Sequence, residues 1–238
     1  MYQLNPIIAI TDRECKQRTS IASLREGERR KYNQEYFAQH YWREDLPNLI
    51  GNRGLSYDDP SHQRRFAFLS KTLIEGRSAQ RVIDVGCGPG HLVEMALADG
   101  VQSFGVDLSE AACKAFNDRT GGRWRDRFTV TPMNRMPFET AHFDLCLCLD
   151  VLEHVIVFDI FDSVRELCRV ASDKIICTIN LDNPYDFHPT ILSRKTWVAL
   201  FESYGAVYYD EAGTEEMSAM ICREYPEYDA FVFKKVSE

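Results

Sequence analysis

Three closely spaced glycines and an acidic residue raise the first chemical question of this sequence. In "VIDVGCGPGHL" Asp84 lies two residues before Gly86, and Gly88 and Gly90 follow. Glycines at such positions let the backbone turn sharply and approach a ligand with no Cβ in the way. A dinucleotide fold places its third glycine one residue later, where a pyrophosphate meets a helix N-terminus. The carboxylate of Asp84 would also repel a diphosphate, so the segment favours a ligand that carries an ammonium group.

A second acidic residue ends the next apolar run, "VQSFGVD". At the end of the second strand of a parallel sheet, Asp107 is placed to accept hydrogen bonds from both hydroxyls of a ribose. Together the two carboxylates and the GxGxG spacing predict a cationic, ribose-bearing cofactor and disfavour a nicotinamide dinucleotide.

These motifs resemble those of a known enzyme family. "VIDVGCGPGHL" and "VDLSE" are similar to the first two motifs of class I S-adenosylmethionine-dependent methyltransferases. "MPFETAHFDLCLCLDVLEHV" resembles the loop after the third strand, and the fourth strand, of the type 11 and type 23 small-molecule families. The resemblance covers roughly residues 78–180. It implies S-adenosylmethionine as methyl donor and S-adenosylhomocysteine as product.

The resemblance also implies which residues hold this cofactor. The glycines line the methionine part, Asp84 lies near its amino group through water, and Asp107 holds the ribose. Many relatives have an acidic residue for the adenine amino group where this chain reads "TPMNRMPF", so the Met133 backbone or the Asn134 side chain is expected to substitute. The implied cofactor residues are Asp84, Gly86, Cys87, Gly88, Gly90, Asp107, Leu108, Met133, Asn134, Leu149 and Asp150.

Methyl transfer from a sulfonium is an in-line displacement, so the protein supplies alignment and, for a hydroxyl acceptor, a base. The segment "NLDNPYDFHPTILSRKTW" resembles a part of small-molecule methyltransferases, often those acting on sugars or natural products, in which a histidine precedes a serine-capped helix. His188 is the predicted general base, because an imidazole titrates near neutral pH. Ser193 is predicted to cap the helix.

Further residues are candidates for acceptor contacts: Tyr36, Tyr41, Trp42, His154 and Tyr185. A purely structural interpretation stays open for several of them. The aromatic residues of "EYFAQHYW" could pack a helical cap onto the core, and "VLEHV" could be a helix start in which Glu153 and His154 serve packing and capping.

The elements that must position these residues alternate after Ser78. Apolar strands and amphipathic helices follow one another from "QRVIDVG" to "KIICTIN", which indicates a parallel sheet buried on both faces. Near the end, "AVYYDEAG" and "EYDAFVFKKV" are predicted to form an antiparallel hairpin that closes the sheet. The predicted fold class is therefore α/β, a Rossmann-like, doubly wound, mostly parallel sheet of seven strands.

The N-terminal third is predicted to form a separate layer. Residues 1 to about 30 suggest an irregular arm, and helices are expected in "KYNQEYFAQHYW" and "HQRRFAFLSKTLIEG". Residues 1–77 are thus the predicted arm and helical cap, and residues 78–238 the cofactor-binding core.

The composition of the chain limits the kinds of partner that it is expected to bind. The 238 residues carry a formal charge of −8, so the chain as a whole repels polyanions and no nucleic-acid partner is expected. The eight cysteines form no CxxC pair, which predicts a reduced, cytoplasmic setting with neither a zinc site nor a disulfide framework. No metal site and no membrane contact is predicted, and the chain is expected to act as a monomer or homodimer.

The predicted function is methyl transfer from S-adenosylmethionine to an O or N atom of a small metabolite, such as a sugar or natural-product intermediate. Three alternatives stay open at this point: an RNA or protein methyltransferase, a nicotinamide-dependent oxidoreductase, and a non-catalytic module that binds a cofactor or a partner.

Overall fold

The structure, a computed structural model, describes residues 20–33, 35–36, 66–67, 69–74, 79–181, 188–209 and 228–236. The acceptor candidates Tyr41, Trp42 and Tyr185 lie outside the described residues. So do parts of both helices predicted for the N-terminal cap. Among the described residues, no helix combines the length and the apolar character needed to cross a membrane.

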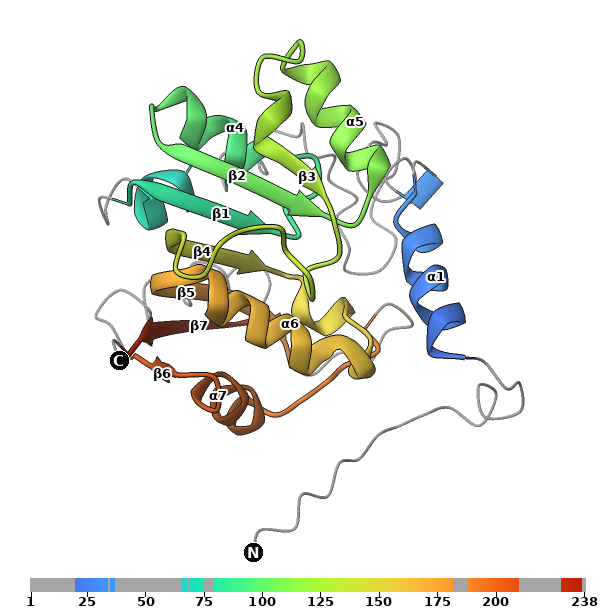
Figure 1. The fold of residues 1–238 in the computed structure, drawn as a ribbon, viewed down its shortest axis with the longest axis vertical. Coiled ribbons are helices and arrows are strands. Elements are labelled where there is room, and N and C mark those ends of the chain that lie inside the picture. Colours follow the sequence, from blue (N-terminus) through green and yellow to red (C-terminus); the bar gives the residue numbers. More distant parts are fainter. Residues whose placement is uncertain are drawn as a thin grey trace, which may run out of the picture.

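Seven strands form one mostly parallel sheet, as predicted, and their order is β3-β2-β1-β4-β5-β7-β6. The first five are parallel, and β7 runs antiparallel to β5 and to β6. In Figure 1 the arrowheads of β1, β2 and β4 point toward the side of the sheet on which helix α1 stands. The strands are β1 (Arg81–Val85), β2 (Gln102–Asp107), β3 (Phe128–Val130), β4 (Phe143–Leu149), β5 (Ala171–Asn180), β6 (Ala206–Tyr208) and β7 (Tyr228–Lys235).

Helices follow the strands at the places where the sequence predicted them. Ser109 and Ser193 accept hydrogen bonds from the backbone N–H groups of Ala112 and Thr196, so each caps its helix and the prediction for Ser193 is confirmed. The helices of the core are α4 (His91–Ala98), α5 (Glu110–Arg119), α6 (Val157–Val170) and α7 (Arg194–Glu202). Two short 3-10 turns, Arg125–Arg127 and Leu152–His154, complete this part.

Side chains on the two faces of the sheet build two buried clusters. Along β4, Cys146 and Cys148 face one cluster while Leu145 and Leu147 face the other, as the alternation of a strand requires. The first cluster packs against α6 and α7, and the second against α4 and the π-helical turn Ser70–Ile74. The carboxyl ends of the parallel strands are left as the one edge at which loops can build a site.

Helix α1 (Ile21–Lys31) corrects the prediction of an irregular arm. Ser20 caps it, and Glu26 pairs with Arg30 one turn later. The helix ends at the residue where the sequence pattern predicted a helix to begin. It buries no residue, so it lacks the apolar stripe on which a prediction from periodicity depends.

Two glycines of the segment 86–90, hereafter the glycine loop, are required by packing as well as by backbone geometry. Gly86 and Gly90 have φ angles of +75° and +73°. A Cβ on Gly86 would lie 2.4 Å from a methyl carbon of Val151, and one on Gly90 would lie 2.6 Å from the ring of Phe116. The tight fit of α5 and of the turn after β4 against this loop therefore depends on these glycines.

We expect Gly90→Ala to destabilise the fold by about 2–4 kcal/mol, because it combines a left-handed backbone with an overlap against a buried ring. Gly100→Ala is the matched control, since Gly100 also has a positive φ but no atom within 4 Å of a Cβ added there. The control should lose only about 1–2 kcal/mol. Urea unfolding measures both, and equal losses would show that the contact with Phe116 does not matter.

Candidate functional site

A cavity of about 600 Å³ lies at the carboxyl ends of β1, β2 and β4. Its walls come from α1, the glycine loop, the end of β2, the loop after β3, the turn after β4 and the first half of α6. Most of the predicted cofactor residues line it: Gly86, Gly88, Asp107, Leu108, Met133, Asn134 and Asp150. Residues predicted from four separate segments of the sequence therefore lie together around one cavity.

The remaining cofactor candidates lie around the cavity and are not among its described lining residues. Asp84 is buried behind the glycine loop, and Cys87 packs under it, where its Sγ would be 2.7 Å from a Cβ added at Gly105. Gly90 begins helix α4, and Leu149 packs against the second core cluster. Their predicted contacts with a cofactor stay predictions.

Asp107 fastens the glycine loop to the end of β2. Its Oδ2 accepts the N–H of Gly88 at 2.9 Å, and its Oδ1 accepts the N–H of Ser109 at 2.8 Å. Burial raises the pKa of this carboxyl, and hydrogen bonds from the backbone N–H groups of Ser109, Gly88 and Leu108 oppose that rise. Each carboxylate oxygen has a second lone pair, so Asp107 can brace the loop and still accept a ligand hydroxyl.

Asp84 places a second carboxyl in the same region, behind the loop. Burial, and then repulsion from Asp107, raises the pKa of Asp84 to about 7. Two neighbouring carboxyls in low dielectric disfavour further negative charge and stabilise a positive one. The surroundings of these two carboxyls are therefore suited to a cationic ligand group.

The turn after β4 holds a strained residue on the cavity wall. Asp150 has φ +59°, which is uncommon for a residue with a side chain. Its N–H donates to the carbonyl oxygen of Thr178 at 3.0 Å, and the Thr178 hydroxyl donates to its carboxylate. Contacts from β5 thus hold Asp150 in this conformation on the cavity wall.

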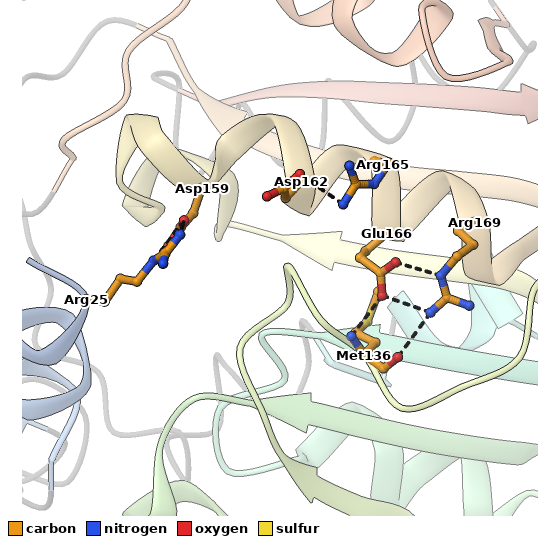
Figure 2. Close-up of polar contacts among 7 residues, drawn as sticks. All are labelled: Arg25, Met136, Asp159, Asp162, Arg165, Glu166 and Arg169. Carbon is orange, nitrogen blue, oxygen red and sulfur yellow. Dashed lines mark hydrogen bonds and ion pairs between the residues drawn. The ribbon is translucent and has the colours of Figure 1, made fainter. Parts of the chain in front are cut away.

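The loop of residues 131–138, which was predicted to meet adenine, is anchored from behind by α6. Figure 2 shows Glu166 accepting the N–H of Met136 at 2.9 Å and the Nε–H of Arg169 at 2.6 Å. Arg169 in turn donates to the carbonyl oxygens of Met136 and Phe138 at 3.0 and 2.7 Å. Burial alone would raise the pKa of Glu166, but these donors hold it below its usual value. Sequence analysis missed both residues, because a charged pair three apart on a helix carries no sign of the loop it holds.

Helix α1 is held over the cavity by an ion pair with α6. Arg25 donates from Nε to both carboxylate oxygens of Asp159, at 3.0 and 2.9 Å, and its Nη2 also contacts Oδ1 (Figure 2). The contact places Arg29 and Tyr32, one and two turns along α1, on the cavity wall. Sequence analysis did not single out Arg25 or Asp159.

Two of the acceptor candidates line the cavity. His154 and Tyr36 both line it, and Tyr32 lies between them, with ring centroids 6.2 Å from His154 and 4.9 Å from Tyr36. His188, the predicted base, stands next to His154 at a centroid distance of 4.6 Å. Among the described residues that line the cavity, His154 is present and His188 is not.

The turn Leu152–His154 and the segment after β5 are joined by Thr190. Its N–H donates to the carbonyl oxygen of Glu153 at 3.2 Å, and its hydroxyl donates to that of Val155 at 2.6 Å. Glu153 is fully buried, as the structural interpretation of "VLEHV" expected, and one of its oxygens accepts the N–H of Asn180 at 3.2 Å. Burial, and then the nearby Asp150, raises the pKa of Glu153 well above its usual value.

Comparison with known proteins decides what this arrangement is. Residues 83–177 match the family model described as a methyltransferase domain. This part of the chain is therefore similar to methyltransferase domains. The match covers the glycine loop, Asp107 and the turn after β4, and it confirms the resemblance to class I methyltransferases found in the motifs.

Relatives with curated names match only part of this chain. A ubiquinone biosynthesis O-methyltransferase of Idiomarina loihiensis is 36% identical over 83 residues, 34% of each chain. An uncharacterized protein of Methanocaldococcus jannaschii is 26% identical over 140 residues, 59% of this chain and 58% of that protein. The chain thus spans about a third of the length of the ubiquinone relatives it matches.

Solved structures with this fold extend over most of the chain. Magnesium protoporphyrin IX methyltransferase of Synechocystis, crystallised with S-adenosylhomocysteine, superposes with a TM-score of 0.65 at 14% identity, covering 89% of this chain and all of that one. A 1,6-didemethyltoxoflavin N1-methyltransferase of Burkholderia thailandensis gives 0.60 at 17% identity, covering 91% and 88%. These likenesses confirm the predicted fold of the chain.

The pKa of Asp84 generates a prediction about stability. Because the folded state raises this pKa from 3.8 to about 7, the ionised carboxylate opposes folding, and its cost grows as pH rises between these values. We expect Asp84→Asn to be more stable than the wild type by about 2–4 kcal/mol above pH 7, with the difference vanishing near pH 4. Thermal unfolding across this range measures it. Asp173→Asn, at an exposed position of β5, is the control and should show no such trend.

The anchor of the 131–138 loop generates a prediction of opposite sign. Glu166→Gln should lower the free energy of unfolding by about 1–3 kcal/mol at pH 7, because it removes charge-assisted hydrogen bonds to Arg169. Since the pKa of Glu166 is lowered by folding, its contribution is full above the ordinary value of 4.5 and is lost as pH falls through the folded value. The difference between the two proteins should therefore shrink in acid.

Asp162→Asn provides the matched control on the same helix. Asp162 pairs with Arg165 at 2.9 Å, but both side chains are about half exposed, so the loss should stay below about 0.5 kcal/mol. Equal losses for the two variants would contradict an anchoring role for Glu166.

Proposed function

We propose that this methyltransferase domain binds S-adenosylmethionine in the cavity and transfers its methyl group to an oxygen or nitrogen atom of a small metabolite. The observation that carries the proposal is the position of Asp107, which joins the glycine loop to the end of β2 and lines the cavity. The methionine part would lie along Gly86 and Gly88, the ribose at Asp107, and the adenine against Leu108 and the 131–138 loop.

Electrostatics supports a sulfonium ligand at this place. The buried carboxyls of Asp84 and Asp107 disfavour a diphosphate and stabilise a positive charge. Neither carboxylate forms an ion pair with a described Lys, Arg or His side chain. A cofactor that carries both an ammonium and a sulfonium group would supply the missing positive charge.

The opposite wall supports a small acceptor. Tyr32, Tyr36 and His154 present rings to the cavity, and Arg29 beside them lines it with a guanidinium that pairs with none of the described acidic side chains. Flat rings with one cation suit a planar, oxygen-bearing metabolite better than a polymer. The relatives named as ubiquinone biosynthesis O-methyltransferases, and the solved small-molecule enzymes, favour the same class. We infer no nucleic-acid partner, in line with the formal charge of −8.

Calorimetric titration tests the cofactor assignment. S-adenosylhomocysteine should bind the wild type, and Asp107→Asn should weaken that binding by about 10- to 100-fold, because the amide cannot accept from both ribose hydroxyls while facing two N–H donors. Asp126→Asn, an exposed carboxyl near α5, is the control and should bind as the wild type does. Binding of NADH without binding of S-adenosylhomocysteine would overturn the proposal.

Turnover tests the acceptor class. Release of S-adenosylhomocysteine should be detected with a panel of small phenols, catechols, amines and hydroxylated sugars. Transfer only to RNA or protein would replace the acceptor class and leave the cofactor assignment intact. Tight cofactor binding with no transfer to any acceptor would favour the non-catalytic module.

A further inference from the structure

Three side chains that can ligate a metal come together at the cavity wall. Ligand atoms of Glu153, His154 and His188 all lie within 4.8 Å of one another. The first two belong to the turn after β4, and the third follows β5. The two hydrogen bonds of Thr190 to that turn hold the segments side by side, so the cluster is a product of the fold and not of neighbouring sequence.

A second observation comes from the buried carboxyl of Glu153. Its side chain is fully buried, and one oxygen accepts the N–H of Asn180. Its Oε2 is also buried and accepts a hydrogen bond from none of the described residues. A buried carboxylate oxygen without a donor is costly, and a bound cation removes that cost.

We propose that Glu153, His154 and His188 form a binding site for a divalent metal ion, with Zn²⁺ the ion that best fits the donors. Two imidazole nitrogens and one carboxylate oxygen suit a borderline ion, whereas Mg²⁺ and Ca²⁺ prefer oxygen ligands alone. Tetrahedral zinc places its ligand atoms roughly 3.3–3.5 Å apart. Where the separations exceed this, rotation of the two imidazole rings can close the site around an ion.

The position of His154 gives the site a relation to the cavity. His154 is the member of the cluster that lines the cavity, while Glu153 is buried and His188 is not among the lining residues. Three protein ligands leave one coordination position open, as in catalytic zinc sites. That position would face the cavity, where it could take an oxygen or nitrogen donor of a small molecule.

The metal site changes the expectations drawn from sequence. The sequence predicted no metal there, because its cysteine spacing gives no zinc motif and His188 lies 34 positions after His154. His188 was predicted to be a general base, but an imidazole that ligates a metal does not take up a proton at the ligating nitrogen. The site rests on the cluster alone, so it does not depend on the proposed methyl transfer.

Titration of the chelator-treated full chain with ZnCl₂ tests the proposal. The wild type should bind one Zn²⁺ with a dissociation constant in the micromolar range or below, and MgCl₂ should bind far more weakly. His188→Ala should weaken Zn²⁺ binding at least tenfold. His142→Ala, whose imidazole packs against Phe138 and Phe143 outside the cluster, is the matched control and should bind as the wild type does.

Two further measurements separate this site from the cysteines and from misfolding. The spectrum of the Co²⁺-substituted protein should lack the sulfur-to-metal charge-transfer band of thiolate ligands. Zn²⁺ should raise the unfolding temperature of the wild type and not that of His188→Ala. Absence of Zn²⁺ binding to the wild type, equal binding by His188→Ala, or a thiolate band would each overturn the proposal.

Discussion

The carboxylate of Asp107 is the contact on which the rest of the site depends. The glycine loop has little side-chain surface of its own, and its backbone adopts positive φ angles that cost free energy unless the surroundings fix them. Asp107 fixes them by accepting an N–H from the loop and another from Ser109, the residue that caps α5. One side chain thereby sets the relative positions of β1, β2 and α5 at the edge where the cavity opens. A ligand that hydrogen-bonds to Asp107 would therefore bind to a preorganised site.

The same edge concentrates buried carboxyl groups, and this ties the two proposals together. Asp84, Asp107 and Glu153 are carboxyls whose pKa values burial raises, and none of them forms an ion pair with a described cationic side chain. Such groups oppose folding at neutral pH. A cationic cofactor beside the first two, and a metal ion at the third, would each convert this cost into binding free energy. The stability gained by Asp84→Asn would then measure the free energy of folding that the buried Asp84 carboxyl costs when no ligand is bound.

The sequence predicted the core well, because burial leaves a direct mark on it. The apolar runs of β1, β4 and β5 indicated a sheet covered on both faces, and the glycine spacing with Asp84 and Asp107 indicated the cofactor class. Contacts between polar residues far apart in the chain leave no such mark. The anchor from Glu166 to Met136, the pair of Arg25 with Asp159 and the meeting of His154 with His188 all join segments at least 30 residues apart. No periodicity or spacing encodes these pairs, so only the fold reveals them.

The two walls of the cavity differ in how firmly they are held, and this bears on what each can recognise. The cofactor wall rests on strands, on packed glycines and on the buried anchor of the 131–138 loop. The α1 wall belongs to a helix that buries no residue and is tied to α6 by Arg25, whose side chain is about half exposed, so salt and water weaken the pair. A wall held this way can shift with little loss of core packing. In the proposed reaction, the methyl donor would thus meet the rigid side of the molecule, and the acceptor would meet the side whose geometry a bound ligand can still adjust.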